Sequence, residues 1–479
     1  MKNRPALGDS QSNVGKNLMT LAGTYNQAWL ENYQTADGDY ANWNGNDQYN
    51  KNPYWDLYKN ENTTAKDVFR LTAKAVWNIT DHLKLQGTIG TDMTYMTFED
   101  FTARTTPGKL AGQLQNQNYN NRTLNAELLA LYNNTFGDFD VNATLGGNIF
   151  KVNNKTDIFT GMDQQMKDIV AIMNYAEQSV QQNTYKKQIN SVFGSASVGY
   201  RHTYYLEATV RGDKSSTLPV SNNIYVYPSF SGSIVFSEFI KNKNLINYGK
   251  IRASWAQVGS DTDPYQLSLN YSTAKYAYGS GKVIGMINNN TQPNKDLKPT
   301  RTNSFELGLE MKFFQGRLGL DFTYYNQLSK DQIIGLASSS TSGYNYRLVN
   351  AGEIENKGVE IALNGRVFQY KDFAWDAGVN FSKNVNKVKS LVDGMDYFEL
   401  EKATWCGVSV GAEVGENYGS IIGKDYMRND DGQLIINAET GLPVTDDKTH
   451  TLGNLSIPSP IGSLLPRTVP RCSSTTTRT

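Results

Sequence analysis

Reactive and metal-binding side chains are scarce in this chain of 479 residues. Its two cysteines, Cys406 and Cys472, cannot build the disulfide framework of a small secreted protein. Its three histidines, His82, His202 and His450, lie far apart and have no cysteine or carboxylate at metal-ligand spacing. We therefore expect no bound metal ion.

Sequence patterns of catalysis are also lacking. No nucleophile elbow and no Cys/His pairing stands out in the local context of a catalytic site. Carboxylates inside alternating segments, such as Glu306, Glu310 and Asp321, are typical of a hydrated row on one side of a β-strand. We predict that the protein is not an enzyme and that it has no catalytic residues and no cofactor.

The chain has neither an excess of one charge nor a long apolar run. Lysine plus arginine and aspartate plus glutamate number 46 each, so there is no basic field for nucleic acid. No apolar run approaches the roughly 20 residues of a membrane helix. The mean hydropathy of −0.53 suits a soluble protein and equally a β-barrel, whose strands alternate lipid-facing and lumen-facing side chains. The 29 tyrosines and 41 glycines favour the barrel, because tyrosine serves at membrane interfaces and glycine in closely packed strands.

The clearest pattern in the sequence is a strict alternation of apolar and polar side chains. Val359, Ile361 and Leu363 point one way and their neighbours the other, which is the period of a strand with one apolar and one wet face. A polar turn at residues 370–372 and a second alternating run at residues 373–382 complete a predicted β-hairpin.

The same alternation recurs from residue 67 onward. Short turns at residues 80–82 and 137–138 alternate with long polar loops, as in outer-membrane barrels with tight periplasmic turns and long external loops. Further strands are predicted at residues 192–200, 204–211, 229–236, 250–258, 265–271, 302–313 and 317–325. Roughly a dozen strands are too many for a small barrel and too few for the 22-stranded plugged transporters.

Two segments depart from the strand pattern. Residues 162–182 place Met166, Ile169 and Val170 at helical spacing, which predicts one short surface helix in an external loop. Residues 1–66 are rich in asparagine, glycine and tyrosine and are predicted to be loop and irregular strand.

Residues 350–360 read Asn-Ala-Gly-Glu-Ile-Glu-Asn-Lys-Gly-Val-Glu. This run resembles the barrel signature of TonB-dependent outer-membrane receptors, particularly the SusC/RagA branch. Runs that begin at Asn52, Pro293 and Tyr418 are similar to further landmarks of that family, so the resemblance extends from about residue 52 to residue 450. The signature residues are Asn350, Gly352, Asn356, Lys357, Gly358 and Glu360.

The resemblance implies an all-β fold, a transmembrane antiparallel β-barrel in the cell outer membrane, present here as part of a 22-stranded plugged barrel. It implies TonB-dependent active import of large nutrients, either glycan oligomers or peptides. The implied partners are a SusD-like surface lipoprotein, the TonB complex and outer-membrane lipid, without nucleic acid. A passive outer-membrane porin and a soluble β-rich glycan-binding protein remain as alternatives.

We expect three parts in the chain: a loop-rich leader at residues 1–66, the barrel portion at residues 67–450, and a non-native or frameshifted tail at residues 451–479. The tail has no acidic or aromatic residue and contains four prolines, which cannot lie in a central strand. Neither a signal peptide nor the plug domain of the family is recognisable. We therefore expect an incomplete barrel that does not transport on its own.

Aromatic side chains in polar loops are the candidate substrate contacts. Trp43, Tyr276, Tyr278, Tyr344 and Tyr346 could place flat rings against a sugar or a peptide. The alternative, which we favour, is a girdle at the membrane interface, because aromatic belts are a structural requirement of membrane barrels.

Overall fold

The chain divides into two compact units. Unit 1 comprises residues 1–76, 86–128 and 148–189, and unit 2 comprises residues 77–85, 129–147 and 190–479. Within the described ranges, no helix is long and apolar enough to cross a membrane. The computed structural model describes residues 13–21, 23–41, 45, 47–241, 243–269, 271–275, 283–287, 290–403 and 408–454.

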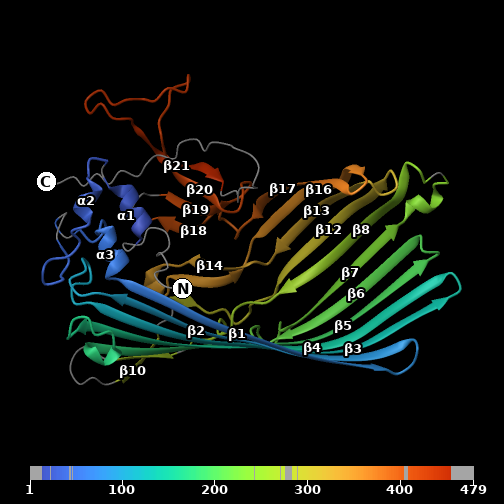
Figure 1. Cartoon of the computed structure of the whole chain (residues 1–479), viewed down its shortest axis with the longest axis horizontal. Coiled ribbons are helices and arrows are strands. Elements are labelled where there is room, and N and C mark those ends of the chain that lie inside the picture. The colour runs from blue at the N-terminus through green and yellow to red at the C-terminus, as the bar shows by residue number, and fades with distance from the viewer. Residues whose placement is uncertain are drawn as a thin grey trace. The chain divides into compact units, whose positions relative to one another are not determined.

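Long β-strands dominate the structure (Figure 1), which confirms the predicted all-β fold. Twelve strands pair in one sheet in the order β1-β2-β3-β4-β5-β6-β7-β8-β12-β13-β16-β17. The twelve strands are β1 Glu61–Asn78, β2 Leu83–Thr102, β3 Gln113–Phe136, β4 Phe139–Gln164, β5 Tyr175–Tyr200, β6 Tyr204–Ser215, β7 Ile224–Ile234, β8 Ile246–Ser260, β12 Thr300–Phe313, β13 Leu318–Lys330, β16 Glu353–Tyr370 and β17 Phe373–Ser390.

Tight turns and long loops alternate along this sheet, as the sequence predicts. The turns at residues 79–82, 137–138 and 371–372 join β1 to β2, β3 to β4 and β16 to β17. Long connections of residues 261–299 and 331–352 separate β8 from β12 and β13 from β16. In unit 2, the strands from β6 to β17 of this sheet run side by side (Figure 1), and each pair of neighbours among them is antiparallel.

The shorter elements lie in the connections and after β17. Three small sheets have the orders β10-β9, β11-β15-β14 and β18-β19-β20-β21. Their strands are β9 Tyr271–Lys275, β10 Val283–Ile287, β11 Thr291–Gln292, β14 Ile333–Ala337, β15 Tyr346–Asn350, β18 Tyr397–Ala403, β19 Val408–Glu413, β20 Ser420–Tyr426 and β21 Thr445–Asn454. The helices are α1 Val14–Thr20, α2 Gln27–Leu30, α3 Pro53–Tyr58 and the 3-10 turns η1 Ile172–Asn174, η2 Phe236–Phe239 and η3 Ser340–Ser342.

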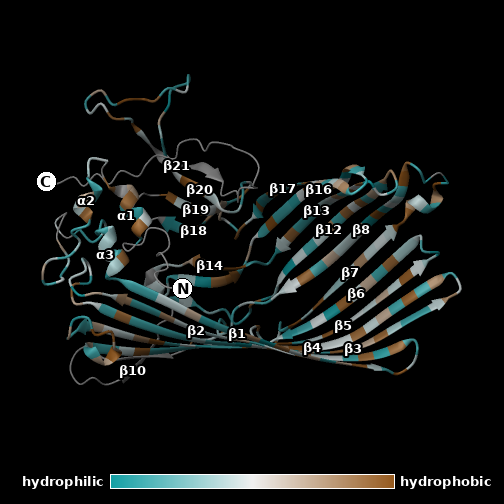
Figure 2. Ribbon diagram, viewed as in Figure 1, coloured by the Kyte–Doolittle hydropathy of each residue, from teal (hydrophilic) through white to brown (hydrophobic). Residues whose placement is uncertain are grey.

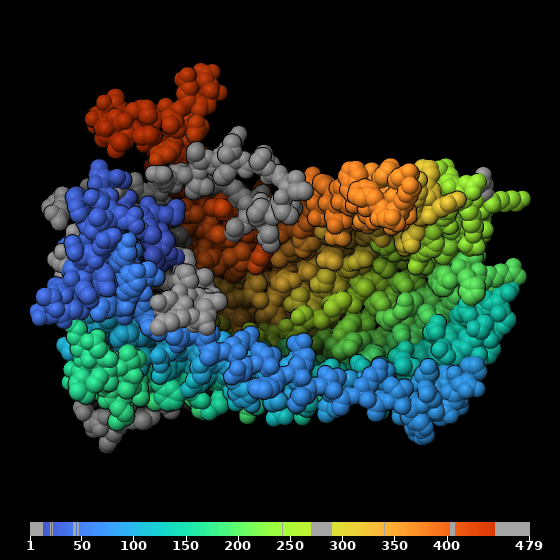
Figure 3. Space-filling view, viewed as in Figure 1, coloured from blue at the N-terminus to red at the C-terminus, as the bar shows by residue number. Residues whose placement is uncertain are grey.

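Apolar side chains of the long strands face outward rather than meeting in an interior. Figure 2 shows hydropathy alternating in bands along the strands. Phe230 and Phe305 leave 55% and 45% of their surface exposed, and Val379 leaves 62%. A water-soluble sheet would bury such a row, whereas a membrane strand presents it to lipid. In the space-filling view, the surface of unit 2 over β7, β8, β12 and β13 is hollowed (Figure 3).

Small cores form instead among the loops and short elements. In unit 1, Leu30 of α2 and Trp55 of α3 are buried. In unit 2, Leu218, Tyr225 and Leu297 form a buried cluster that joins the loops after β6 and before β12. These small cores hold the loops in place. The long strands themselves bury little apolar surface.

The predicted helix at residues 162–182 is wrong. β4 continues to Gln164, β5 begins at Tyr175, and only the single turn η1 lies between them. Met166, Ile169 and Val170 are exposed, so the helical spacing has no apolar surface to pack against. The side chain of Asn174 instead closes the loop by donating to the carbonyls of Met166 and Ile169 at 2.6 and 2.8 Å.

Other boundaries also differ from the sequence interpretation. Residues 265–269 are not strand, and Tyr265 has a φ of 69°, in the left-handed region that a strand cannot contain. The described part of the leader contains three short helices rather than irregular strand, and β1 begins at Glu61 rather than at residue 67. The expected tail begins inside β21, and its residues 455–479 lie outside the described residues, so its origin stays a prediction.

Candidate functional site

The polar side of five neighbouring strands of unit 2 forms one continuous surface, which we call the polar face. The ladder registers of β8, β12, β13, β16 and β17 place its side chains in rows across the strands. Glu306, Glu310 and Asp321 share this face, as the alternation predicts. In strand order, the rows are Ser254, Glu306, Tyr325, Gly358 and Asn384; then Arg252, Gly308, Thr323, Glu360 and Ser382; then Lys250, Glu310, Asp321, Ala362 and Asn380.

Tyr325 lies flat on the polar face because its neighbour across the ladder is a glycine. A Cβ atom added to Gly358 would fall 2.6 Å from the Tyr325 hydroxyl oxygen and 2.7 Å from its Cζ atom. The hydroxyl donates a hydrogen bond of 3.1 Å to Asn384 Oδ1 on β17. The ring therefore spans from β13 across β16 to β17, held at its end by one hydrogen bond.

In the next row, the side chain of Arg252 lies over Gly308, as Tyr325 lies over Gly358; we call such a position a glycine seat. A Cβ atom at Gly308 would meet Arg252 Nε at 2.4 Å. The guanidinium donates to Asp321 Oδ1 at 3.1 Å and to Thr323 Oγ1 at 2.7 Å. Asp321 is therefore neutralised within the wall and its charge is not free for a ligand.

Beside Tyr325 the polar face is indented by a hollow of about 350 Å³, which we call the central hollow. Its walls carry hydroxyl, amide and carboxylate groups and one aromatic ring. Such a mixture can bind a polar ligand by hydrogen bonds while the ring supplies an apolar contact. The lining residues are Glu306, Thr323, Tyr325, Gln327, Asn356, Glu360 and Asn384.

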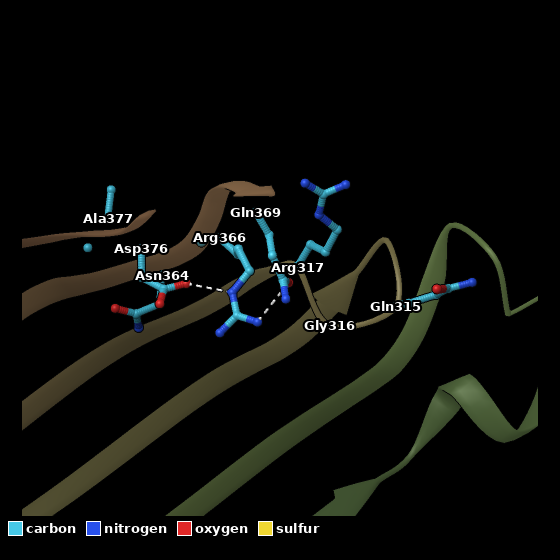
Figure 4. A pocket seen from close by; sticks show the side chains of 10 residues that line it. Gln315, Gly316, Arg317, Asn364, Arg366, Gln369, Asp376 and Ala377 are labelled. Carbon is cyan, nitrogen blue, oxygen red and sulfur yellow. Dashed lines mark hydrogen bonds and ion pairs between the residues drawn. The ribbon is translucent and has the colours of Figure 1, made fainter. Parts of the chain in front are cut away.

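A larger hollow of about 670 Å³ lies near the turns that end β12 and β16 (Figure 4). Arg366 lies there between Asp376, at 2.9 Å from its Nε atom, and Gln369, which accepts from Nη1 at 3.1 Å. Asn364 and Gly378 face each other in the same hollow. Both ionic partners are well exposed, so the Arg366–Asp376 pair orders the surface more than it stabilises the fold.

The signature residues divide into two groups. Asn350 and Gly352 shape loops: Asn350 Nδ2 donates to the carbonyls of Lys298 and Asp331 at 2.7 and 3.0 Å. Gly352 has a φ of 84°, which favours glycine. Asn350 therefore links three chain segments, and Gly352 allows the chain to turn into β16.

The remaining signature residues lie on β16. Asn356 and Glu360 line the central hollow, and Gly358 seats Tyr325. Lys357 Nζ lies 3.8 Å from Glu355 Oε2, outside the hollow. The run that identifies the family in the sequence thus builds one wall of the central hollow.

Of the five loop aromatics, the structure describes only Tyr344 and Tyr346. Trp43, Tyr276 and Tyr278 lie outside the described residues. Tyr344 is half-buried in the loop after β14, and Tyr346 opens β15 with 47% of its surface exposed. Substrate contact by these five residues stays a prediction.

Sequence reasoning missed Tyr325. The signal was present, since Tyr325 falls in the polar phase of an alternating strand whose apolar phase holds Phe322 and Tyr324. Its importance depends on the glycine opposite, and that pairing requires the register of β13 against β16.

Unit 1 has its own organised polar cluster around α3. Trp55 is 1% exposed, and its indole N–H donates to Thr106 Oγ1 at 2.8 Å. Asn52 caps the helix through the backbone N–H of Tyr54 and also donates to the carbonyl of Leu30. The run at Asn52 therefore serves to fasten the leader to the loop after β2.

Lys51 and Asp56 form a buried ion pair in this cluster. Lys51 Nζ lies 3.4 Å from Asp56 Oδ1, and their side chains are 4% and 1% exposed. Burial lowers the pKa of Lys51 and raises the pKa of Asp56, outweighing the attraction between the two charges. Asn17 and Asn60 donate further hydrogen bonds to the carboxylate of Asp56.

The described part of the chain shows neither a cluster of metal ligands nor a serine placed as a nucleophile. No three histidine, cysteine, aspartate or glutamate side chains there gather as metal ligands. The sequence does contain one Gly-x-Ser-x-Gly match, the Gly-Val-Ser-Val-Gly run around Ser409, contrary to the expectation that such patterns are lacking. Ser409 lies within strand β19 rather than on a strand-to-helix turn, so it is not a nucleophile elbow. Its hydroxyl pairs with the Tyr397 hydroxyl at 2.9 Å, which is a structural contact.

Known proteins that are similar to this chain are β-barrel receptors. The family described as TonB dependent receptor-like, beta-barrel matches residues 8–455. TonB-dependent receptor P3 of Formosa agariphila is 29% identical over 406 residues, which are 82% of this chain and 40% of the relative. TonB-dependent receptor SusC of Bacteroides thetaiotaomicron is 27% identical over 213 residues, covering 43% of this chain and 21% of SusC.

Solved structures show the same fold. The RagAB peptide transporter has a TM-score of 0.70 at 18% identity, covering 84% of this chain and 44% of that one. This chain therefore spans less than half the length of receptor P3 and of the matched RagAB chain. These matches confirm the resemblance carried by the signature residues and the partial β-barrel fold. The chain belongs to the TonB-dependent receptor β-barrel family, whose SusC- and RagA-type members reside in the outer membrane.

Proposed function

We propose that this protein takes part in the TonB-dependent import of large nutrients, glycan oligomers or peptides, across the outer membrane. Membership of the receptor family supports transport rather than catalysis. The chain spans 40% of the length of receptor P3, so import is proposed for the receptor of which these strands form a wall.

One observation carries the proposal. The strands of unit 2 are two-sided, with exposed apolar side chains such as Phe305 on one side and the hollowed polar face on the other. Apolar side chains directed outward suit lipid, and a polar inner wall suits the passage of hydrophilic cargo. A soluble glycan-binding protein would instead bury the apolar rows.

A SusD-like surface lipoprotein is the proposed partner, on the basis of the SusC/RagA-type signature from Asn350 to Glu360. Affinity purification of the tagged protein from detergent-solubilised outer membranes tests this. Recovery of a lipoprotein in about equal amount would support the partnership. Recovery of the receptor alone under several mild detergents would contradict it.

Dependence on energy separates active import from the alternative, a passive porin. Cells that produce the protein are given fluorescent hexasaccharides and hexapeptides, with and without a protonophore that dissipates the proton-motive force. Active import predicts that uptake of one class stops when the force is dissipated or TonB is removed. Uptake that continues unchanged in both conditions would establish a porin instead.

A further inference from the structure

We propose that Tyr325 and the rim of the central hollow form a binding subsite for one sugar ring of a neutral oligosaccharide. This inference rests on the proposed import function and narrows its cargo from large nutrients to glycans. It concerns a site on the strands and uses none of the five loop aromatics named above.

The first part of the subsite is the ring of Tyr325, which we call the platform. Because Gly358 has no side chain, the ring of Tyr325 can lie along the sheet instead of standing upright on it. Its hydroxyl is tied to Asn384, so the ring is fixed before any ligand arrives. A flat, pre-ordered aromatic face binds the apolar C–H face of a pyranose with little loss of side-chain entropy.

The second part is the rim, which consists of the side chains of Glu306, Gln327, Asn356 and Glu360. Glu306 faces Tyr325 across β12 and β13, and Glu360 lies one row further along β16. Gln327 and Asn356 face each other across β13 and β16, two residues further along the same side. All four side chains line the central hollow together with the ring.

These four rim groups retain their hydrogen-bonding capacity. Among the described residues, the side chains of Glu306, Glu360, Gln327 and Asn356 enter no hydrogen bond or salt bridge, in contrast with neighbouring Thr323, which already accepts from Arg252. Two carboxylates offer acceptors, and two carboxamides offer both donors and acceptors. Sugar hydroxyls both donate and accept, so they match this mixed set.

The chemistry favours a sugar over a peptide. A peptide that binds by strand addition takes its affinity from backbone partners at a sheet edge, whereas this surface lies in the middle of five paired strands. A lysine or arginine side chain could pair with Glu306 and Glu360, but it would leave the two amides unused. A ring with hydroxyls around its rim uses the platform and all four rim groups at once.

The test measures binding by the purified full chain in detergent micelles. The probes are maltohexaose, cellohexaose and xylohexaose, with hexaglycine and tetralysine for comparison. The variants are Tyr325→Ala, Tyr325→Phe and a matched control, Tyr324→Ala, which removes the adjacent tyrosine on the apolar side. Circular dichroism and heat-modifiable electrophoretic mobility verify the fold. If Tyr325→Ala does not fold, Tyr325→Leu replaces it, because leucine fills the seat over Gly358 without an aromatic face.

We expect at least one hexasaccharide to bind and Tyr325→Ala or Tyr325→Leu to weaken that binding about tenfold, as loss of one stacking contact implies. Tyr325→Phe should weaken it no more than about threefold, since the ring remains, and Tyr324→Ala should leave it unchanged. Unchanged sugar binding without the Tyr325 ring, no binding of any hexasaccharide, or Tyr325-dependent binding of the peptides alone would each overturn the subsite. Because this assay contains neither TonB nor a membrane potential, its failure is distinguishable from failure of the import proposal.

Discussion

Asn350 closes a bidentate link with the backbone of Lys298. Its Oδ1 atom accepts from the Lys298 N–H at 2.8 Å, and its Nδ2 atom donates to the Lys298 carbonyl at 2.7 Å. The amide thus imitates one rung of a β-ladder between the connection before β12 and the end of β15. The same Nδ2 atom also reaches the carbonyl of Asp331, so three chain segments meet at one side chain.

Replacing Asn350 by alanine should loosen these connections without unfolding the strands. Loss of the three hydrogen bonds at this residue implies a cost of about 2–3 kcal/mol in local stability. Hydrogen exchange should show faster exchange in residues 293–299 and 346–352. Asn350→Asp should behave similarly, because a carboxylate cannot donate to the carbonyls of Lys298 and Asp331. Unchanged exchange in both variants would contradict the role assigned to Asn350.

Gly358 should tolerate no side chain. A methyl group there would approach the Lys383 carbonyl oxygen to 2.4 Å and the Tyr325 hydroxyl to 2.6 Å. Gly358→Ala should therefore lower the free energy of unfolding in urea by about 1–3 kcal/mol through overpacking. Gly319→Ala is the matched control, since its nearest neighbour would lie at an ordinary 3.7 Å. Equal effects of the two variants would contradict the glycine seat.

The buried Lys51–Asp56 pair should show how ion pairs behave away from water. Asp56→Ala leaves the Lys51 ammonium without its counter-charge and should cost about 3–5 kcal/mol in stability of the α3 cluster. The double variant Lys51→Met, Asp56→Asn removes both charges and should cost less than the single variant. Protection of Trp55 and its neighbours from hydrogen exchange measures the difference. A double variant less stable than the single one would contradict this expectation.

The same pair gives the cluster a dependence on pH. The pKa of folded Asp56 is raised above its ordinary 3.8, so the folded carboxyl keeps a proton that the unfolded chain has lost. Stability should therefore fall as the pH rises from about 3.8 through the pKa of folded Asp56. The pKa of folded Lys51 is lowered from 10.5, so stability should rise as the pH increases from that lowered value to 10.5. Exchange protection corrected for the intrinsic rate measures both limbs, and Asp56→Asn should abolish the acidic one. An acidic limb that survives in Asp56→Asn would show that another group causes it.

The strands could be predicted from the sequence because their alternation needs no knowledge of neighbours. Val359, Ile361 and Leu363 show the period of two by themselves, and the turn at residues 371–372 follows from polar residues between two such runs. The false helix at residues 162–182 shows the limit of periodicity. An apolar spacing indicates a helix only when a surface exists for it to cover, and Met166 and Ile169 have none.

The site could be predicted only in part. The signature run placed Asn356, Gly358 and Glu360 on one strand, but their partners on β13 are set by the ladder register. A shift of one residue would move Tyr325 to the lipid side. The cluster around Trp55 depends on Thr106, which lies 51 residues later, and no local pattern announces such a contact.

Charge placed on the apolar side should be far more costly than charge on the polar side. Leu307→Arg puts a guanidinium against lipid, which should cost about 2–4 kcal/mol near the middle of the membrane. Glu306→Arg, one residue earlier on the polar face, should change stability by much less. Urea unfolding in lipid vesicles gives both values. Comparable losses would indicate that the two sides meet the same solvent.

Spin-label scanning of β12 in lipid vesicles tests most directly whether the two sides of the strands meet different solvents. With Cys406 and Cys472 replaced by serine, single cysteines at residues 303–310 carry the label, and collision with oxygen or with a water-soluble nickel chelate is measured. Labels at residues 305, 307 and 309 should collide mainly with oxygen, and labels at residues 304, 306, 308 and 310 mainly with the chelate. The absence of a period of two, or labels at residues 305, 307 and 309 that are shielded from both reagents, would contradict a membrane strand with one lipid face and one hydrated face.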